Sequence, residues 1–122
     1  MNLLEQESRI YILTEFTITT GKVDAFREIA QELLDIVKEK EPETLRYIWY
    51  FDKHQSKSYL VEEYPNAAAL RAHAIHVGIT LPKILKISKP KFVVLGKPHL
   101  ITKEILSGFG SQSFTFWNGV AR

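Results

Sequence analysis

The chain has 122 residues, of which 45% are hydrophobic and 25% are charged, and its formal net charge at pH 7 is +2. This size and composition predict one globular domain with one core, and they exclude disordered and collagen-like chains. Lysines are interleaved with glutamates along most of the sequence, and the small basic excess over residues 83–91 includes no aromatic residue. We therefore expect no nucleic-acid partner.

The sequence contains no cysteine, which excludes disulfides, iron–sulfur clusters, thiolate zinc sites and cysteine nucleophiles. Residues 1–9 are expected to form a flexible N-terminal segment, and they lack the charged-then-apolar order of a signal peptide. No run of about 18 apolar residues exists to span a bilayer. We therefore expect a cytoplasmic protein with no membrane partner.

Two periodicities divide most of the chain into strands and helices. Residues 10–18 alternate with a period of two, as strands do, although both alternating sets include apolar side chains. Residues 22–40 place apolar side chains every three or four positions, which predicts an amphipathic helix that ends at Glu41 and Pro42. The other expected elements are strands at 45–51 and 59–64 joined by a polar turn, a helix that begins after Pro65, a short helical segment from residue 80, and a strand at 91–95.

The order strand, helix, strand, strand, helix, strand predicts a ferredoxin-like α+β sandwich, in which two helices cover one face of a four-stranded antiparallel sheet. We assign residues 10–97 to this domain and residues 98–122 to a C-terminal extension of the same domain. Within the extension, residues 100–106 are weakly helical in pattern and residues 113–117 are typical of a late strand.

The face of the predicted sheet that carries no helix is rich in aromatic residues. It would form a large exposed apolar patch unless a second subunit covered it. We therefore expect a homodimer. The pattern leaves open whether Tyr47, Trp49 and Phe51 or, alternatively, Ile48 and Tyr50 point to that face.

The stretch over residues 61–77, VEEYPNAAALRAHAIHV, gathers the candidate acid and base side chains. Asn66 is expected to cap the helix, because its side-chain oxygen can accept from backbone N–H groups two or three residues further on. His73 lies on the apolar face of that helix, and His76 lies about 60° further round. If the helix folds back over its own strand, His73 lies near Glu62, and we expect burial to keep its imidazole neutral.

Residues 10–95 resemble the antibiotic biosynthesis monooxygenase domain, the quinol-monooxygenase-like group of the dimeric α+β barrel superfamily. The similar stretches are TTGKVDAFREIAQEL, EPETLRYIWY and VEEYPNAAALRAH, in the order and at the spacing usual in that family. The positions that carry the resemblance are Gly21, Phe26, Glu41, Pro42, Thr44, Tyr47, Glu62, Tyr64, an Ala-Leu pair and His73.

The resemblance implies a dimer whose two sheets face one another as a barrel, with a pocket in each subunit between sheet and helices. The family includes oxygenases that use no metal or flavin on quinols and polycyclic phenols, haem-degrading enzymes, an isomerase of a signalling sugar phosphate and proteins without a settled activity. The haem-degrading branch is disfavoured, because Thr14 and Glu63 stand where that branch has an asparagine and a tryptophan. The fold alone does not choose among the others.

We take His73 and Glu62 as the candidate catalytic residues. An imidazole with its usual pKa of about 6.5 could act as a general base near neutrality, although His73 could instead be a structural histidine under the sheet. Glu62 could orient that imidazole or form an ion pair with Arg46. The candidate substrate-pocket residues are Tyr47, Trp49, Tyr64, Asn66 and His76, with helix capping as the alternative role of Asn66.

We expect neither a metal nor another cofactor. His73 and His76 with Glu62 form a weak ligand set, and no glycine-rich phosphate loop is present. His54 and His99 are expected to be exposed to solvent. Three hypotheses remain, namely a cofactor-independent monooxygenase acting on a quinol or related phenolic or polycyclic aromatic compound, an isomerase of a small carbonyl compound, and a non-catalytic small-molecule-binding dimer.

Overall fold

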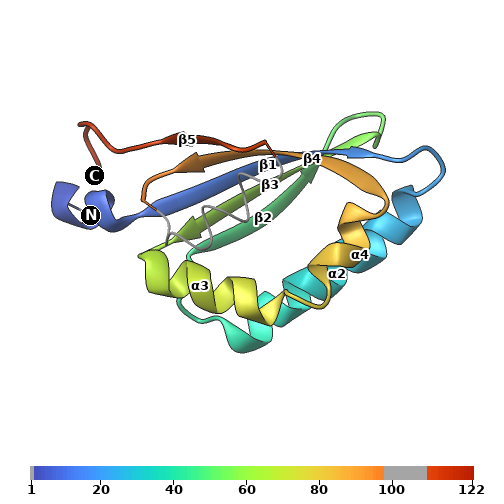
Figure 1. Cartoon of the computed structure of the whole chain (residues 1–122), viewed down its shortest axis with the longest axis horizontal. Helices are drawn as coiled ribbons and strands as arrows, with labels where there is room; N and C mark the ends of the chain where they lie inside the picture. Colours follow the sequence, from blue (N-terminus) through green and yellow to red (C-terminus); the bar gives the residue numbers. More distant parts are fainter. Residues whose placement is uncertain (1, 98–109) are drawn as a thin grey trace.

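The computed structural model describes residues 2–97 and 110–122, which form one sheet with helices packed against it (Figure 1). In chain order the elements are α1 Leu3–Ser8, β1 Ile10–Ile18, α2 Val23–Lys40, β2 Arg46–Phe51, β3 Lys57–Tyr64, α3 Ala67–His76, α4 Leu81–Leu85, β4 Ser88–Leu95 and β5 Gln112–Phe114. No helix in these ranges combines the length and the apolar character that crossing a membrane requires.

Strand β1 lies at the centre of the sheet, whose order is β2-β3-β1-β4-β5. It is antiparallel to β3, with Ile10 opposite Tyr64, and antiparallel to β4, with Ile18 opposite Ser88. Strand β2 continues the sheet as an antiparallel hairpin with β3. This order and these directions confirm the predicted ferredoxin-like fold.

Helices α2, α3 and α4 lie on the same side of the sheet (Figure 1). The apolar stripe of α2 is buried against the sheet, and Phe26 lies edge-on to Phe16 of β1 at 5.5 Å between ring centroids. Trp49 of β2 stacks on Phe16 at 5.7 Å. Aromatic packing of this kind fixes how α2 crosses the sheet, and therefore where its C-terminal end arrives.

Among the residues that the structure describes, none forms a helix on the opposite face of the sheet. Tyr47, Trp49 and Phe51 pack among the core residues on the helical side, which resolves the alternative that the sequence leaves open. The side chains between them point the other way, and Ile48 and Tyr50 are 38% and 54% exposed. The uncovered face is therefore apolar in part.

Within residues 1–9, which we expect to be flexible, Leu3–Ser8 form the short helix α1. The side chain of Asn2 caps this helix by accepting from the backbone N–H of Glu5 at 2.9 Å, and the hydroxyl of Ser8 donates to the carbonyl of Pro65 at 2.8 Å. An asparagine followed three residues later by a glutamate is a known helix-start pattern, and this signal was overlooked.

The C-terminal extension adds a strand, as predicted, but β5 is shorter than the range 113–117 and runs parallel to β4. The helix expected at 100–106 lies outside the described residues. Gly96 follows the last residue of β4, with a φ of +115°, and its N–H donates to the carbonyl of Phe114 at 2.7 Å. A Cβ at this position would lie 2.5 Å from the carbonyl oxygen of Arg9, so the junction requires glycine.

Candidate functional site

Helix α3 begins immediately after β3 and returns over the sheet. The side-chain oxygen of Asn66 accepts from the backbone N–H of Ala69 at 3.0 Å, which confirms Asn66 as the cap. Ala69, Leu70 and His73 are the buried residues of the helix. His73 therefore points at the sheet, as the spacing predicts.

Helix α2 ends beside α3 and supplies a second acidic group to the same place. Glu41 follows the last residue of α2, and its backbone N–H donates to the carbonyl of Val37 at 3.0 Å. The Glu41 side chain is only 3% exposed, and it accepts from the hydroxyl of Thr44 at 2.8 Å. A helix C-terminus disfavours an anion, so this carboxylate needs cationic or hydrogen-bonding partners.

His73 provides that partner, because it lies between two glutamates. Its Nδ1 is 2.8 Å from Oε1 and 3.1 Å from Oε2 of Glu41, and its Nε2 is 3.3 Å from Oε1 of Glu62. An ionised carboxylate only accepts hydrogen bonds, so both ring nitrogens carry a hydrogen. His73 is therefore an imidazolium ion.

The pKa of His73 agrees with this hydrogen-bond pattern. Burial lowers the pKa, but the hydrogen bonds and charges of Glu41 and Glu62 outweigh burial and raise it to about 9. Burial also opposes ionisation of Glu41, yet its hydrogen bond to His73 and the nearby positive charge leave the pKa of Glu41 below its usual value. The expectation of a neutral His73 is wrong, because two carboxylates, rather than one, face the ring.

Two tyrosines enclose the imidazolium from the sheet side. The rings of Tyr47 and Tyr64 lie 5.2 Å and 5.4 Å from that of His73, and the hydroxyl of Tyr64 donates to Oε1 of Glu62 at 2.5 Å. Burial, followed by the negative charge of Glu62, raises the pKa of both hydroxyls well above the usual value. Both tyrosines therefore remain neutral, and Tyr64 serves as a donor.

His76 extends the cluster toward the surface. Its Nδ1 lies 3.2 Å from Oε2 of Glu41, and its side chain is 31% exposed. An open cavity of about 160 Å³ adjoins His76 and Glu41. The remaining residues that line it are Lys40, Pro42, Glu43, Thr44, Ala69 and Ala72. Of the two histidines on α3, only His76 lines this cavity.

The structure brings five of the seven predicted site residues together, namely Glu62, His73, Tyr47, Tyr64 and His76. Trp49 lies edge-on to Tyr47 at 5.8 Å between ring centroids, and it lines a separate cavity together with Arg27. Asn66 serves as the helix cap. Arg46 pairs with Glu63 at 2.8 Å, so the alternative of an ion pair between Glu62 and Arg46 is not realised.

Glu41 is the site residue that the sequence analysis missed, since it enters there only as the end of a helix and as one position of the family resemblance. The signal was present, because an acidic side chain at a helix C-terminus opposes the helix dipole and needs a compensating partner. Thr44, three residues further on, supplies a hydrogen bond to it. Of the other two histidines, His54 is exposed and His99 lies outside the described residues.

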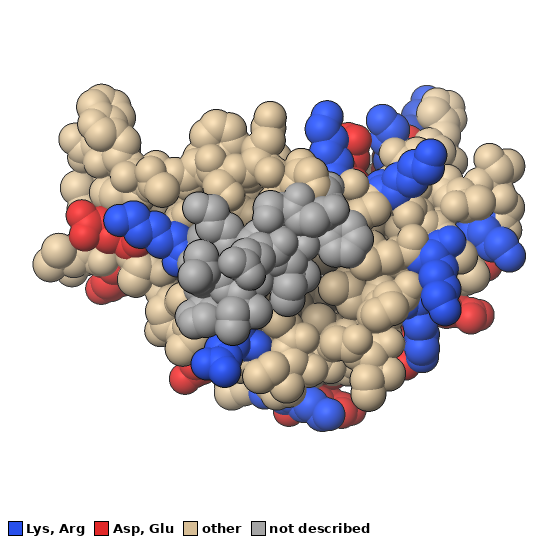
Figure 2. All heavy atoms as spheres, in the orientation of Figure 1, with Lys and Arg blue, Asp and Glu red and all other residues tan. Residues whose placement is uncertain are grey.

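On the side viewed in Figure 2, outside the grey atoms, the basic and acidic side chains lie mainly around the edges. Among residues 2–97 and 110–122, no three acidic or histidine side chains are arranged to hold a metal ion.

The fold and the cluster define a class of protein, a small ferredoxin-like α+β domain with an acid–base cluster buried between α3 and the sheet. Residues 9–76 match the sequence profile described as antibiotic biosynthesis monooxygenase. The match spans more than half of the chain, and the protein belongs to the antibiotic biosynthesis monooxygenase family. No curated protein shows a significant match to the sequence.

Solved structures share the fold over most of the chain. MupZ from Pseudomonas fluorescens superposes with a TM-score of 0.79 at 18% identity, over 94% of this chain and 95% of that chain. A putative antibiotic biosynthesis monooxygenase from Caulobacter crescentus CB15 gives a TM-score of 0.66 at 18% identity, over 80% of this chain and 100% of that one. Rv0793 from Mycobacterium tuberculosis gives a TM-score of 0.65 at 17% identity, over 75% of this chain and 97% of that chain. At these identities, the likeness shows a common fold.

Proposed function

We propose that this protein is a small-molecule monooxygenase that acts on a phenol or quinol, in which the substrate itself supplies the electrons to O₂. Membership of the antibiotic biosynthesis monooxygenase family supports a monooxygenase-like role. The observation that carries the proposal is the hydrogen-bonded series Tyr64, Glu62, His73, Glu41, His76, which begins under the sheet and ends at a cavity.

His76 is the proton acceptor in this proposal. Because the carboxylate of Glu41 accepts from Nδ1, that nitrogen carries the hydrogen, and Nε2 of a neutral His76 is left with a free lone pair. A carboxylate that fixes the tautomer of a histidine base is the arrangement found in catalytic triads. Glu41 is then the positioning residue of the base.

His73 and Glu62 act through Glu41 rather than on the substrate. The imidazolium of His73 keeps Glu41 ionised and fixes the plane of its carboxylate, and Glu62 with Tyr64 holds the other side of the ring. We therefore propose His73 and Glu62 as positioning residues, which changes the role that we expected for His73 from its sequence position.

The chemistry needs little else from the protein. Removal of the phenolic proton makes the ring electron-rich enough to reduce O₂, and a base and an oriented position are what the protein contributes. For a hydroquinone, one oxygen atom enters the ring, the other leaves as water, and the product is a hydroxyquinone. The substrate supplies all four electrons, so no external reductant enters the balance.

His76→Gln tests this function. We expect the variant to consume O₂ with methylhydroquinone on the order of a hundredfold more slowly than the parent, because glutamine can keep the hydrogen bond to Glu41 but cannot take up the proton. The measurement is enzyme-dependent oxygen uptake with ¹⁸O₂ incorporation into the product, after subtraction of autoxidation.

His54→Gln is the matched control, since His54 lies in an exposed turn, and it should retain the parent rate. Full activity in His76→Gln would show that the base is elsewhere. If neither the parent protein nor His54→Gln turned over any hydroquinone, the monooxygenase proposal would be abandoned in favour of an isomerase or a binding protein.

A further inference from the structure

We propose that the cavity between the end of α2 and the outer side of α3 binds a single aromatic ring that carries a neutral hydroxyl group, with that hydroxyl donating to Nε2 of His76. The inference deepens the proposed function by naming the substrate class, and it rests on that function only for turnover. The site differs from the pocket between sheet and helices that the family resemblance implies.

The size of the cavity suits one ring. Its volume is about 160 Å³. An apolar cavity of about 150 Å³ in another protein holds one benzene molecule, so the cavity accommodates a monocyclic phenol, and a second ring would extend through its open side into solvent. Under the sheet, by contrast, the rings of Tyr47 and Tyr64 already lie within 5.4 Å of His73.

The walls of the cavity suit the two faces of a ring. Ala69 and Ala72 present only methyl groups from α3, and Pro42 presents a flat apolar ring from the loop after α2. Glu41 and His76 supply the polar atoms at one end. A site that is apolar on its walls and polar at one end orients a phenol with its hydroxyl group inward.

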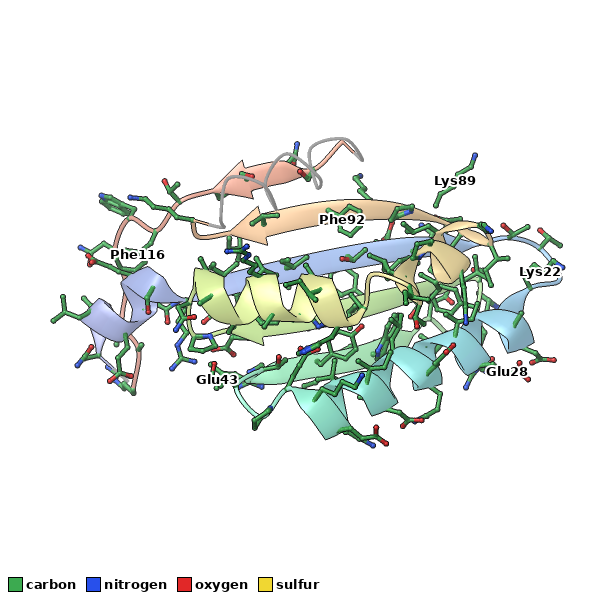
Figure 3. All side chains as sticks on the ribbon, turned by 60° about the horizontal axis from the view of Figure 1, so that its bottom comes forward. Lys22, Glu28, Glu43, Lys89, Phe92 and Phe116 are labelled. Carbon is green, nitrogen blue, oxygen red and sulfur yellow. The ribbon has the colours of Figure 1, made fainter. Side chains whose placement is uncertain are left out.

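The charges around the cavity favour a neutral donor over an anion. Glu41 is already bonded to His73, Thr44 and His76, and Nε2 of His76 remains as an acceptor beside it. Glu43 adds a second carboxylate to the lining, on the loop that joins α2 to β2 (Figure 3). Lys40 is the one lysine or arginine among the lining residues, and it is exposed. A carboxylate or phosphate on the ligand would meet two acidic side chains, whereas a hydroxyl group meets an acceptor.

Ligand binding separates this inference from catalysis. Phenol, which does not reduce O₂ under mild conditions, is titrated into the isotope-labelled protein while the side-chain NMR signals of His76 are followed. We expect a saturable shift of the His76 signals, with binding at least tenfold weaker for 4-hydroxybenzoate and no tighter for 2-naphthol. The first probe adds a negative charge and the second adds a ring.

Ala72→Leu fills the cavity, and Ala74→Leu places the same side chain on an exposed position of α3 that does not line it. We expect Ala72→Leu to weaken phenol binding at least tenfold and Ala74→Leu to leave it unchanged. Equal binding in the two variants would overturn the site. So would tighter binding of 2-naphthol than of phenol.

The two proposals fail in different ways. If phenol binds beside His76 and Ala72→Leu abolishes binding, but no hydroquinone is oxidised, the site stands and the monooxygenase function falls. If hydroquinones are oxidised equally well by Ala72→Leu and by Ala74→Leu, the function stands and this cavity is not the substrate site.

Discussion

His73 shows how two acidic neighbours change the behaviour of a buried imidazole. A single carboxylate would leave one ring nitrogen free to accept a proton, but Glu41 and Glu62 occupy both. The result is a buried cation between two carboxylates. Removal of His73 or of either glutamate would leave a buried charge without its full set of partners. The proton of His73 is therefore part of the folded structure.

This bound proton predicts how stability depends on pH. The pKa of His73 is about 9 when folded and about 6.5 when unfolded, so its contribution is complete below pH 6.5 and is lost as the pH rises through 9. We expect the free energy of unfolding to fall by roughly 2 to 3 kcal/mol between pH 6.5 and pH 9. Urea unfolding at several pH values measures it.

His73→Gln should be less stable than the parent at pH 6.5 and should show little further loss between pH 7 and pH 9. His54→Gln, which alters an exposed turn, should keep the slope of the parent protein. A parent protein whose stability is flat over this interval would mean that His73 is neutral when folded. Acid has the opposite effect through Glu41, whose lowered pKa makes stability fall as the pH drops through and below 4.5.

The sequence located His73, Glu62 and Tyr64 together because a capped helix after a strand folds back over that strand. It did not reveal the charge state of His73, because Glu41 comes from a different helix and its approach depends on the aromatic packing of α2. Local periodicity predicts which way a side chain points. It does not predict which side chains of an element distant in sequence will contact that side chain.

Among the elements, α3 depends strongly on the residue that caps its N-terminus. Its hydrophobic pattern is weak, since alanines occupy much of the helix, and Asn66 makes its one side-chain cap. We expect Asn66→Ala to lower the free energy of unfolding by about 1 kcal/mol. Thermal or urea unfolding at pH 6.5 measures the change.

Asn66→Ser keeps an oxygen that can accept from the backbone, and it should lose much less stability than Asn66→Ala. Equal losses in the two variants would mean that the hydrogen bond to Ala69 does not stabilise the helix. Because His73 lies two turns beyond the cap, oxygen uptake by Asn66→Ala should remain close to that of the parent at low temperature.

The long elements were predictable, and the differences arise at their ends. Strand β4 begins at Ser88 rather than at residue 91 and includes Pro90, which the sequence analysis placed outside the strand. Strand β5 pairs only with Val93–Leu95 and does not reach Pro90. Proline has no backbone N–H to donate, and this is tolerated where a strand has no neighbour on that edge. A parallel partner brought from the far end of the chain has no local signal in the sequence.

At the scale of the whole molecule, the uncovered sheet face predicts a homodimer. Ile48, Tyr50 and Tyr59 are 38%, 54% and 39% exposed there, and half-buried Val61, opposite Ile48, and Leu13, opposite Val61, share the face. An apolar face of this kind is typical of a contact between subunits. We expect sedimentation equilibrium to show a dimer at micromolar concentration.

Ile48→Lys should weaken the dimer at least roughly tenfold, because a charge would be buried in the contact. Ile75→Lys is the matched control, since Ile75 is 69% exposed on α3, away from the sheet, and this variant should leave the dimer intact. A parent protein that sediments as a folded monomer, or equal weakening by both substitutions, would contradict the dimer.

The central position of β1 has a consequence for synthesis on the ribosome. Ile10 pairs with Tyr64 and Ile18 with Ser88. Both strands that pair with β1 are therefore synthesised well after β1 itself. Helix α2 can form as it emerges, but it has no finished sheet to cover until β3 and β4 exist. Contacts so distant in sequence close slowly, and the nascent chain exposes an apolar strand in the meantime. Chaperone demand in the cell should therefore be greatest before residue 95 has left the exit tunnel.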